Sequence, residues 1–251
     1  MIPKIIHYIW LGNQPIPTAQ KTIIEDWRRF LPDYQFYFWG NDTINMVQSA
    51  FVEEACSVGK WAFATDYIRL WALYQYGGIY IDTDVVLKQS FDSLLNHSAF
   101  IGRENCLQIR GRKTEYDLTS FCLGAEKEHP FIQQCLEYYS QRHFILSDGE
   151  SLPPNLKWDM RNASEIYARM ASLSGYKPGA LSPGQQETSN GLTIIPWDIF
   201  SQYFSHLSQG SWREAPLPEI DYSFRYKISW RIRHIVSKML GWFDYIMVKL
   251  K

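Results

Sequence analysis

The chain has 251 residues, of which 46% are hydrophobic and 20% are charged, and its formal net charge is −1 at pH 7. This length and composition suit one α/β domain with a sizeable core. They exclude a low-complexity or repeat protein, and we expect no nucleic-acid partner. No stretch approaches the ~18 consecutive apolar residues of a membrane-spanning helix.

The four cysteines (Cys56, Cys106, Cys122 and Cys135) show neither a CxxC pair nor a metal-like spacing. Reduced thiols are therefore expected, as in cytosolic proteins. Residues 1–4 lead directly into an apolar run, without the longer apolar region of a signal peptide. We expect a cytoplasmic protein.

The first half of the chain alternates apolar, strand-like runs with segments of helical spacing. We predict strands at residues 3–11, 34–39 and 79–81, and helices at residues 18–30 and 60–76. Asn41 or Asp42 can cap a short helix that follows the second strand, because either side chain can accept a bond from a free N–H.

The second half continues the alternation with shorter elements. We predict extended segments at residues 85–87, 100–102, 120–125 and 193–196, helical segments at 91–95, 129–139 and 161–173, and loops at 103–119, 151–157 and 176–190. Alternating strands and helices predict an α/β sheet whose ligand crevice lies outside the carboxyl ends of the strands.

Asp82 and Asp84 follow the predicted strand at residues 79–81, which a helix and a Gly-Gly pair precede. Carboxylates at i and i+2 on an extended backbone point to the same side. They suit Mn²⁺ or Mg²⁺, which fill their remaining ligand positions with water and substrate phosphate. The predicted partner is therefore a metal-bound diphosphate. The alternatives are a solvated turn, or a phosphatase that uses such acids as nucleophile and acid, which Val85 and Val86 fit poorly.

Asp66 and Arg69 stand at i and i+3 on a helix that is otherwise apolar on nearly all sides, so they are neighbours. A local ion pair is one interpretation. Charges within such a helix lose their solvation, so the other interpretation adds polar partners, which the hydroxyls of a bound sugar would supply.

Trp10 ends the first strand at the edge of the crevice, where it either stacks on a nucleobase or packs in the core. Residues 206–212 lie where a sheet-type enzyme needs a lid. A neutral imidazole from His206 or a hydroxyl can complete a metal's ligand shell, and the indole of Trp212 can cover a diphosphate. Ordinary surface residues are the alternative.

The basic charge gathers in residues 225–251, which hold seven Lys or Arg and one acid. Their apolar residues follow one helical face, which predicts a basic amphipathic helix appended to a domain at residues 1–224. Such a helix suits an anionic membrane surface. The alternative is a terminal helix that packs on its own domain.

The run at residues 62–69, continued by Tyr-Gly-Gly-Ile-Tyr-Ile-Asp-Thr-Asp at residues 76–84, resembles the DXD sugar-binding region of glycosyltransferase family 32. That family includes bacterial capsule and O-antigen transferases and the catalytic domains of the large clostridial glucosylating toxins. Residues 2–12 are similar to its first strand, and residues 195–212 to its closing segment. The resemblance covers roughly residues 1–212 and implies a GT-A fold, a Rossmann-like α/β domain with a mixed, mostly parallel sheet flanked by helices.

The resemblance also implies a nucleotide-sugar donor, Mn²⁺ or Mg²⁺, and retention of anomeric configuration. The implied roles are base stacking by Trp10, binding of donor-sugar hydroxyls by Asp66 and Arg69, contact with the nucleotide ribose and sugar by Tyr80 and Asp82, and metal binding by Asp84.

The closing segment departs from the family's more usual His-His-x-x-Gly-Ser-Trp. Ser205 stands where the first His is common, and one residue is added before Gly210. His206 and Ser211 are therefore both candidate metal ligands, with Ser211 and Trp212 as candidate nucleotide contacts.

Together these features predict a retaining, metal-dependent glycosyltransferase that moves a hexose from a nucleotide-sugar, with UDP-sugars favoured over GDP-mannose, to a lipid-linked glycan acceptor. We expect it to act in bacterial surface-polysaccharide synthesis, on the inner face of the cell membrane. The departing phosphate can take the acceptor's proton, so no protein base is expected. The alternatives are a DxD phosphohydrolase and a non-catalytic protein that binds nucleotide-sugars or membrane surfaces.

Overall fold

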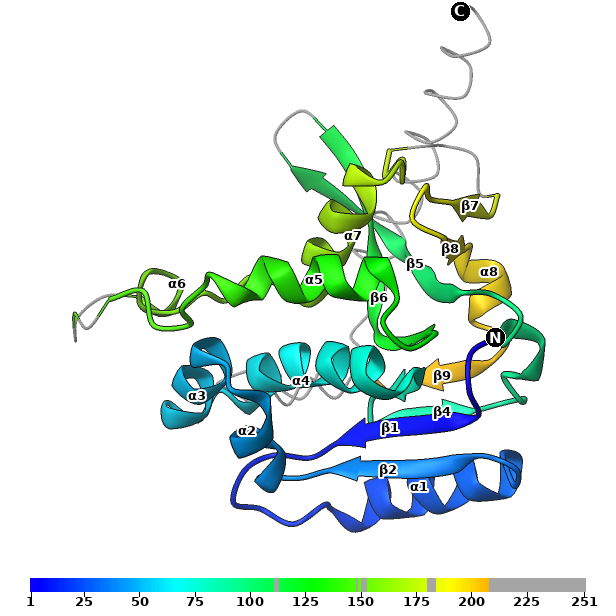
Figure 1. Ribbon diagram of the computed structural model, residues 1–251, viewed down its shortest axis with the longest axis horizontal. Coiled ribbons are helices and arrows are strands. Elements are labelled where there is room, and N and C mark those ends of the chain that lie inside the picture. The colour runs from blue at the N-terminus through cyan, green and yellow to red at the C-terminus, as the bar shows by residue number, and fades with distance from the viewer. Residues whose placement is uncertain (111–112, 148, 150–152, 180–183, 208–251) are drawn as a thin grey trace, which may run out of the picture.

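The computed structural model describes residues 1–110, 113–147, 149, 153–179 and 184–207 (Figure 1). Its elements are β1 (Ile5–Ile9), α1 (Thr18–Phe30), β2 (Gln35–Trp39), α2 (Asp42–Val47), α3 (Ala50–Ser57), α4 (Trp61–Tyr76), β3 (Gly78–Ile81), β4 (Val85–Leu87), the 3₁₀ turn η1 (Asp92–Leu94), β5 (Ala99–Arg110), β6 (Lys113–Ala125), α5 (Pro130–Ser140), α6 (Pro154–Lys157), α7 (Ala163–Leu173), β7 (Gln186–Glu187), β8 (Leu192–Ile195), α8 (Trp197–Phe200) and β9 (Phe204–His206). Among these helices, none combines the length and the apolar character that crossing a membrane requires.

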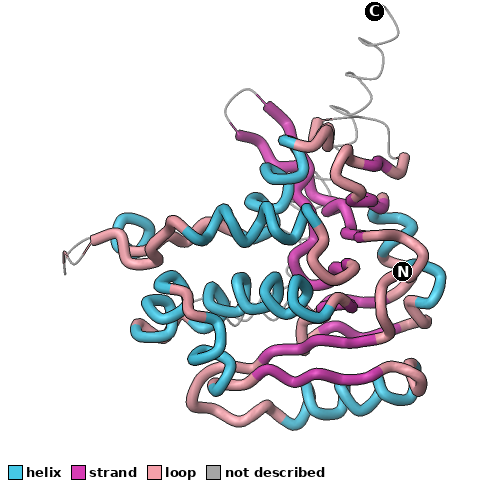
Figure 2. Tube along the Cα trace, viewed as in Figure 1, coloured by secondary structure: helices cyan, strands magenta, loops and turns pink. Residues whose placement is uncertain are grey.

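The described strands form a seven-stranded sheet in the order β2-β1-β3-β6-β5-β8-β7 and a two-stranded sheet of β4 and β9 (Figure 2). β1 pairs in parallel with β2 and β3, and β5 pairs in parallel with β8. β6 is antiparallel to both β3 and β5, and β7 is antiparallel to β8. Five of the seven strands therefore run in one direction, which confirms the expected mixed, mostly parallel α/β sheet.

Helices cover both faces of the main sheet (Figure 1). On one face, α3, α4, α5 and α7 share a core in which Ile68, Phe131 and Tyr167 are fully buried. On the other face, α1, α8 and the small sheet share a second core around Trp27 and Phe204. Alternate residues of β3 enter the two cores, as the period of two of a strand buried on both faces requires.

The predicted loop at residues 103–119 is wrong. β5 and β6 continue through it as a long antiparallel hairpin, with register shifts on either side of Arg103. The polar residues that made this segment resemble a loop stand on strands that extend beyond the helical cover (Figure 1), where polar side chains need no core to enter.

Several shorter elements also differ from the prediction. β7 lies within the predicted loop at 176–190, α6 within the one at 151–157, and α3, α8 and β9 were not predicted. All of these elements except the eight-residue α3 have two to four residues, which are too few periods for a pattern to reveal them. The thiols of Cys56, Cys122 and Cys135 are free, as expected. The predicted tail helix at residues 225–251 lies outside the described residues.

Candidate functional site

The site begins where α4 turns into β3. Gly77 and Gly78 have φ values of +66° and +106°, which favour glycine. A Cβ on Gly78 would stand 2.6 Å from the carbonyl oxygen of Ile5, so the tight turn also needs the missing side chain. This turn lets β3 leave the helix and pair at once with β1.

His7 holds this turn from β1. Trp39 donates its indole N–H to His7 Nδ1 at 3.1 Å, so the imidazole carries its proton on Nε2 and donates it to the Gly77 carbonyl at 2.7 Å. Burial lowers the pKa of His7 to about 4, although the bond to Gly77 acts in the opposite direction. The neutral imidazole therefore connects β1 to β2 and to the Gly-Gly turn through two hydrogen bonds.

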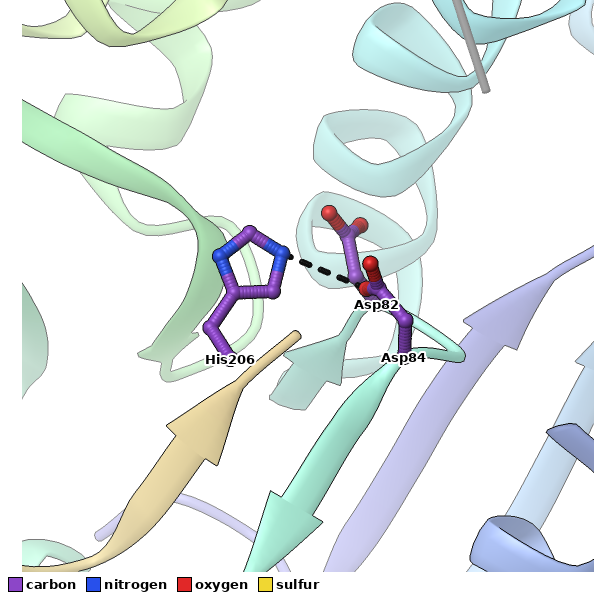
Figure 3. Close-up of side chains that lie close together, drawn as sticks. All are labelled: Asp82, Asp84 and His206. Atoms are coloured by element: carbon purple, nitrogen blue, oxygen red, sulfur yellow. Dashed lines mark ion pairs between the residues drawn. The ribbon is translucent and has the colours of Figure 1, made fainter. Parts of the chain in front are cut away.

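Asp82 and Asp84 lie in a turn that follows β3, and not on extended backbone as predicted. The Val85 N–H donates to the Asp82 carbonyl at 3.1 Å, which closes the turn. The two carboxylates nevertheless come together, and ligand atoms of Asp82, Asp84 and His206 all lie within 4.8 Å of one another (Figure 3). The two acids lie close together as expected, but a turn and not an extended backbone brings them together.

His206 reaches the acids from β9, a strand and not the predicted lid. β9 pairs with β4 so that His206 stands opposite Val85, and its Nε2 lies 3.2 Å from Asp84 Oδ1 (Figure 3). Its ring stacks on Phe121 with centroids 4.1 Å apart. Burial lowers the pKa of His206, but the hydrogen bond and charge of Asp84, with the charges of Asp82 and Glu104, raise it above its usual value.

Arg69 is the centre of the α4 side of the site and is only 4% exposed. Its Nη2 lies 2.9 Å from Asp66 Oδ1 and 3.7 Å from Asp82 Oδ1, so one guanidinium bridges the two acids. Nη1 donates to the Ser120 carbonyl at 2.5 Å, and the guanidinium lies over the Tyr80 ring at 4.5 Å. The predicted neighbourhood of Asp66 and Arg69 is confirmed, and the pair connects directly to the acidic turn.

Asp66 retains an unusual environment despite this ion pair. Burial raises the pKa of Asp66 to about 6, with Arg69 lowering it and Asp82 raising it. Tyr167 of α7 donates its hydroxyl to the Asp66 carbonyl at 3.5 Å. Tyr80 is also buried, and its hydroxyl donates to Asp82 Oδ1 at 2.5 Å. A buried acid with a raised pKa beside further charged groups is typical of a functional site.

Trp10 follows β1 at the same sheet edge as Asp82, because β1 and β3 are parallel neighbours. Its ring is partly exposed, and its N–H donates to the Gln14 carbonyl at 2.8 Å. Asn41 does not cap α2 with its side chain as predicted; it accepts the Gly12 N–H at 2.9 Å and donates to the Gly12 carbonyl at 3.1 Å. These two hydrogen bonds fix the turn behind Trp10.

Sequence reasoning missed Glu104, which lies on β5 within the second register shift of the hairpin, between Arg103 and Leu107. Burial raises the pKa of Glu104 to about 7, while His206 lowers it and Asp117 raises it. A lone Glu in an apparent loop carries no sequence pattern, so only the fold could bring it to the site. The predicted contacts Ser211 and Trp212 lie outside the described residues.

The cluster fits a divalent cation. Two carboxylates and one imidazole within 4.8 Å supply oxygen and nitrogen donors from one side, which suits an ion that keeps other positions for water and phosphate. Asp82, Asp84 and His206 would hold it. Asp82 is shared with Tyr80 and Arg69, whereas Asp84 faces His206.

Comparison with known proteins agrees with this geometry. Residues 17–101 match the family described as a glycosyltransferase sugar-binding region containing DXD motif. Inositol phosphoceramide mannosyltransferase 3 of Schizosaccharomyces pombe is 31% identical over 141 residues, which cover 53% of this chain and 36% of that protein. Lactosylceramide 4-alpha-galactosyltransferase of Rattus norvegicus is 24% identical over 144 residues, or 57% and 35% of the two chains.

The solved structures that match include PaToxG glycosyltransferase, with 20% identity, a TM-score of 0.49 and coverage of 68% of this chain and 69% of that one. The chain spans less than half the length of the first curated relatives it matches, 36% and 45%. Its mixed sheet between helices is consistent with a GT-A fold. The chain therefore carries a glycosyltransferase sugar-binding region containing a DXD motif, and eukaryotic mannosyltransferases are among its relatives.

Proposed function

We propose that the protein is a retaining, metal-dependent glycosyltransferase that moves a hexose from a nucleoside-diphosphate sugar to a glycan acceptor. One observation carries this proposal. The cluster of Asp82, Asp84 and His206, whose two acids lie within the DXD region, adjoins the buried pair of Asp66 and Arg69. A cation-binding group and a sugar-binding group therefore stand side by side.

Each part of the site has a task in this chemistry. Cleavage of the bond between the anomeric carbon and the diphosphate leaves negative charge on the phosphate, which a bound Mn²⁺ or Mg²⁺ neutralises. Asp84 and His206 would hold that ion with Asp82. Asp66 and Arg69 are paired at 2.9 Å and largely buried, so they can orient sugar hydroxyls.

The acceptor that we propose is a lipid-linked glycan. Two relatives, inositol phosphoceramide mannosyltransferase 3 and lactosylceramide 4-alpha-galactosyltransferase, are named for ceramide-based acceptors. We propose UDP-sugars as the first donors to test and GDP-mannose as the second. Work in bacterial surface-polysaccharide synthesis, at the inner face of the cell membrane, is a further part of this proposal.

The test is a screen of UDP- and GDP-sugars with and without Mn²⁺, read by thermal shift and by release of the nucleoside diphosphate. A ligand that binds the folded state should raise the melting temperature. Asp84→Asn should abolish release, whereas Asp33→Asn, an exposed acid of α1's exit turn, should leave it unchanged. Nuclear magnetic resonance of the product should show a retained anomeric configuration.

Other outcomes would refute the proposal. Release of inorganic phosphate from simple esters would indicate a DxD phosphohydrolase. Binding of a nucleotide-sugar with no turnover in any condition, unaffected by Asp84→Asn, would indicate a non-catalytic binding protein.

We also propose that residues 225–251 attach the protein to anionic membranes. Each of several basic residues near such a surface contributes ~1 kcal/mol. Flotation with phosphatidylserine vesicles should therefore be lost on deletion of residues 225–251. Unchanged flotation would rule out this attachment.

A further inference from the structure

Glu104 lies at the same edge of the sheet as the acidic turn. Ile81 of β3 stands opposite Cys122 of β6, and Ile101 of β5 stands opposite Leu123, so β3 and β5 reach this edge at nearly the same level. β5 runs in the same direction as β3 and makes its last pairing with β8 at Gly102. Glu104 follows at once, where the hairpin leaves the sheet.

The backbone around Glu104 is irregular in a way that redirects side chains. The pairing of β5 with β6 shifts between Ile101 and Arg103 and again between Arg103 and Leu107. Such bulges bend a strand and re-aim its side chains, and they are common beside active sites. Arg103 lies over the Tyr116 ring, on the hairpin itself, whereas Glu104 interacts with the charge of His206.

The carboxylate of Glu104 lacks hydrogen-bond donors among the described residues around it. Its side chain is partly buried, and none of the residues that the structure describes donates a hydrogen bond to it. Its charge is attracted by His206 and repelled by Asp117. A desolvated carboxylate without donors is costly, so its position beside the cluster indicates a task for its negative charge.

The placement suggests that task. A diphosphate bound through a cation at Asp82, Asp84 and His206 would carry its sugar on an oxygen of the terminal phosphate, so groups around the cluster would lie near the anomeric carbon. Asp66 and Arg69 border the cluster from α4. Glu104 borders it from β5, two strands away from β3.

We propose that Glu104 is a catalytic residue whose carboxylate stabilises positive charge at the anomeric carbon while the donor is cleaved. This inference rests on the proposed function. In the step, the bond from the anomeric carbon to the phosphate oxygen breaks, and its electron pair leaves with the nucleoside diphosphate. The acceptor oxygen, or water in hydrolysis, bonds to that carbon and gives its proton to the departing phosphate. Glu104 contributes charge and remains unchanged.

The experiment measures donor hydrolysis in the full-length chain with Mn²⁺, which needs no knowledge of the acceptor. Glu104→Gln and Glu104→Ala should lower the hydrolysis rate constant roughly 100-fold, the usual effect of losing one electrostatic stabiliser. The Kd for UDP with Mn²⁺ should change by less than about 3-fold, because binding of the leaving group does not use Glu104. Glu137→Gln, on the exposed face of α5, is the matched control and should behave as the wild type.

Sodium azide or formate should restore part of the activity of Glu104→Ala, since a small anion can occupy the vacated volume. Full hydrolysis by Glu104→Gln would overturn the inference, as would loss of UDP binding or of thermal stability in both variants, which would indicate a structural role. Absence of hydrolysis and of transfer in the wild type would instead refute the proposed function itself.

Discussion

Replacement of Arg69 by Met tests whether the site is held by one buried cation. Arg69 is 4% exposed, and its guanidinium lies 2.9 Å from Asp66 and 3.7 Å from Asp82. It also donates to two carbonyl oxygens, those of Thr65 and Ser120. Methionine fills a similar volume but leaves both acids and both carbonyls without this partner.

The expected magnitude follows from the asymmetry of buried ion pairs. Removing one partner of such a pair leaves a buried charge uncompensated and costs about 3 to 5 kcal/mol. Since the free energy of unfolding of a typical domain is about 5–15 kcal/mol, Arg69→Met should remove a large share of the total stability. Neutralising Asp66 should have the opposite sign. Burial raises the pKa of Asp66 from 3.8 to about 6, so its ionised form is the less favourable one in the fold.

The sign of the Asp66 effect can be followed with pH. Its folded-state pKa is the higher one, so Asp66 adds stability below pH 3.8 and that contribution is lost as the pH rises through 6. At pH 8 the ionised group therefore costs about 3 kcal/mol relative to an ordinary acid. Asp66→Asn at pH 8 should accordingly be neutral or stabilising, while Arg69→Met is strongly destabilising.

Urea unfolding at pH 8, followed by tryptophan fluorescence, measures both variants and the double variant. The double variant should be more stable than Arg69→Met, because one uncompensated acid has been removed. A loss below about 1 kcal/mol for Arg69→Met, or an equal loss for Asp66→Asn, would refute the idea that Arg69 is the essential cation.

Three further outcomes are expected. His7→Gln should reduce the pH dependence of stability: burial lowers the pKa of His7 from 6.5 to about 4, so the wild type should lose about 3 kcal/mol relative to the variant as the pH falls across that window, measured by urea unfolding. Gly78→Ala should cost on the order of 2 kcal/mol or more because its Cβ would meet the Ile5 carbonyl, whereas Gly59→Ala, with positive φ but open space, should cost less in the same assay. Asn41→Asp keeps the acceptor for the Gly12 N–H but loses the donor to the Gly12 carbonyl, which should loosen the turn behind Trp10. The Kd for UDP, measured by calorimetry, should therefore rise roughly 3- to 10-fold. An effect as small as that of Asn13→Ala would contradict the idea that Asn41 positions Trp10.

The parts of the fold that the sequence could predict are those with long, local patterns. The helix predicted at residues 18–30 has the bounds of α1, and the one predicted at 60–76 differs from α4 by one residue. Their periodicity extends over several turns, and tertiary packing did not change the structure that this pattern favours. The hairpin at residues 103–119 was missed because its stability comes from pairing across the turn, and its polar composition is that of a loop.

The site divides in the same way. Asp66 with Arg69, and Asp82 with Asp84, are close in sequence, so spacing alone predicted their proximity. His206 was predicted beside the two acids and lies near them, but on a strand and not in a lid. Glu104 and the bonds of Asn41 to Gly12 depend on contacts between segments 29 or more residues apart, which one sequence does not reveal.

The acidic turn, which carries Asp82 and Asp84, is also the junction between the two sheets. This position explains how a turn can hold two side chains at a fixed spacing. β3 enters it from the main sheet, and β4 leaves it into the small sheet, where β9 brings His206. The Trp27 indole donates to the Val85 carbonyl at 2.7 Å, which ties the exit of the turn to α1 and the second core. Strand pairing and core packing thus set the spacing of Asp82, Asp84 and His206, and the scaffold would hold the like-charged acids in place for the proposed cation.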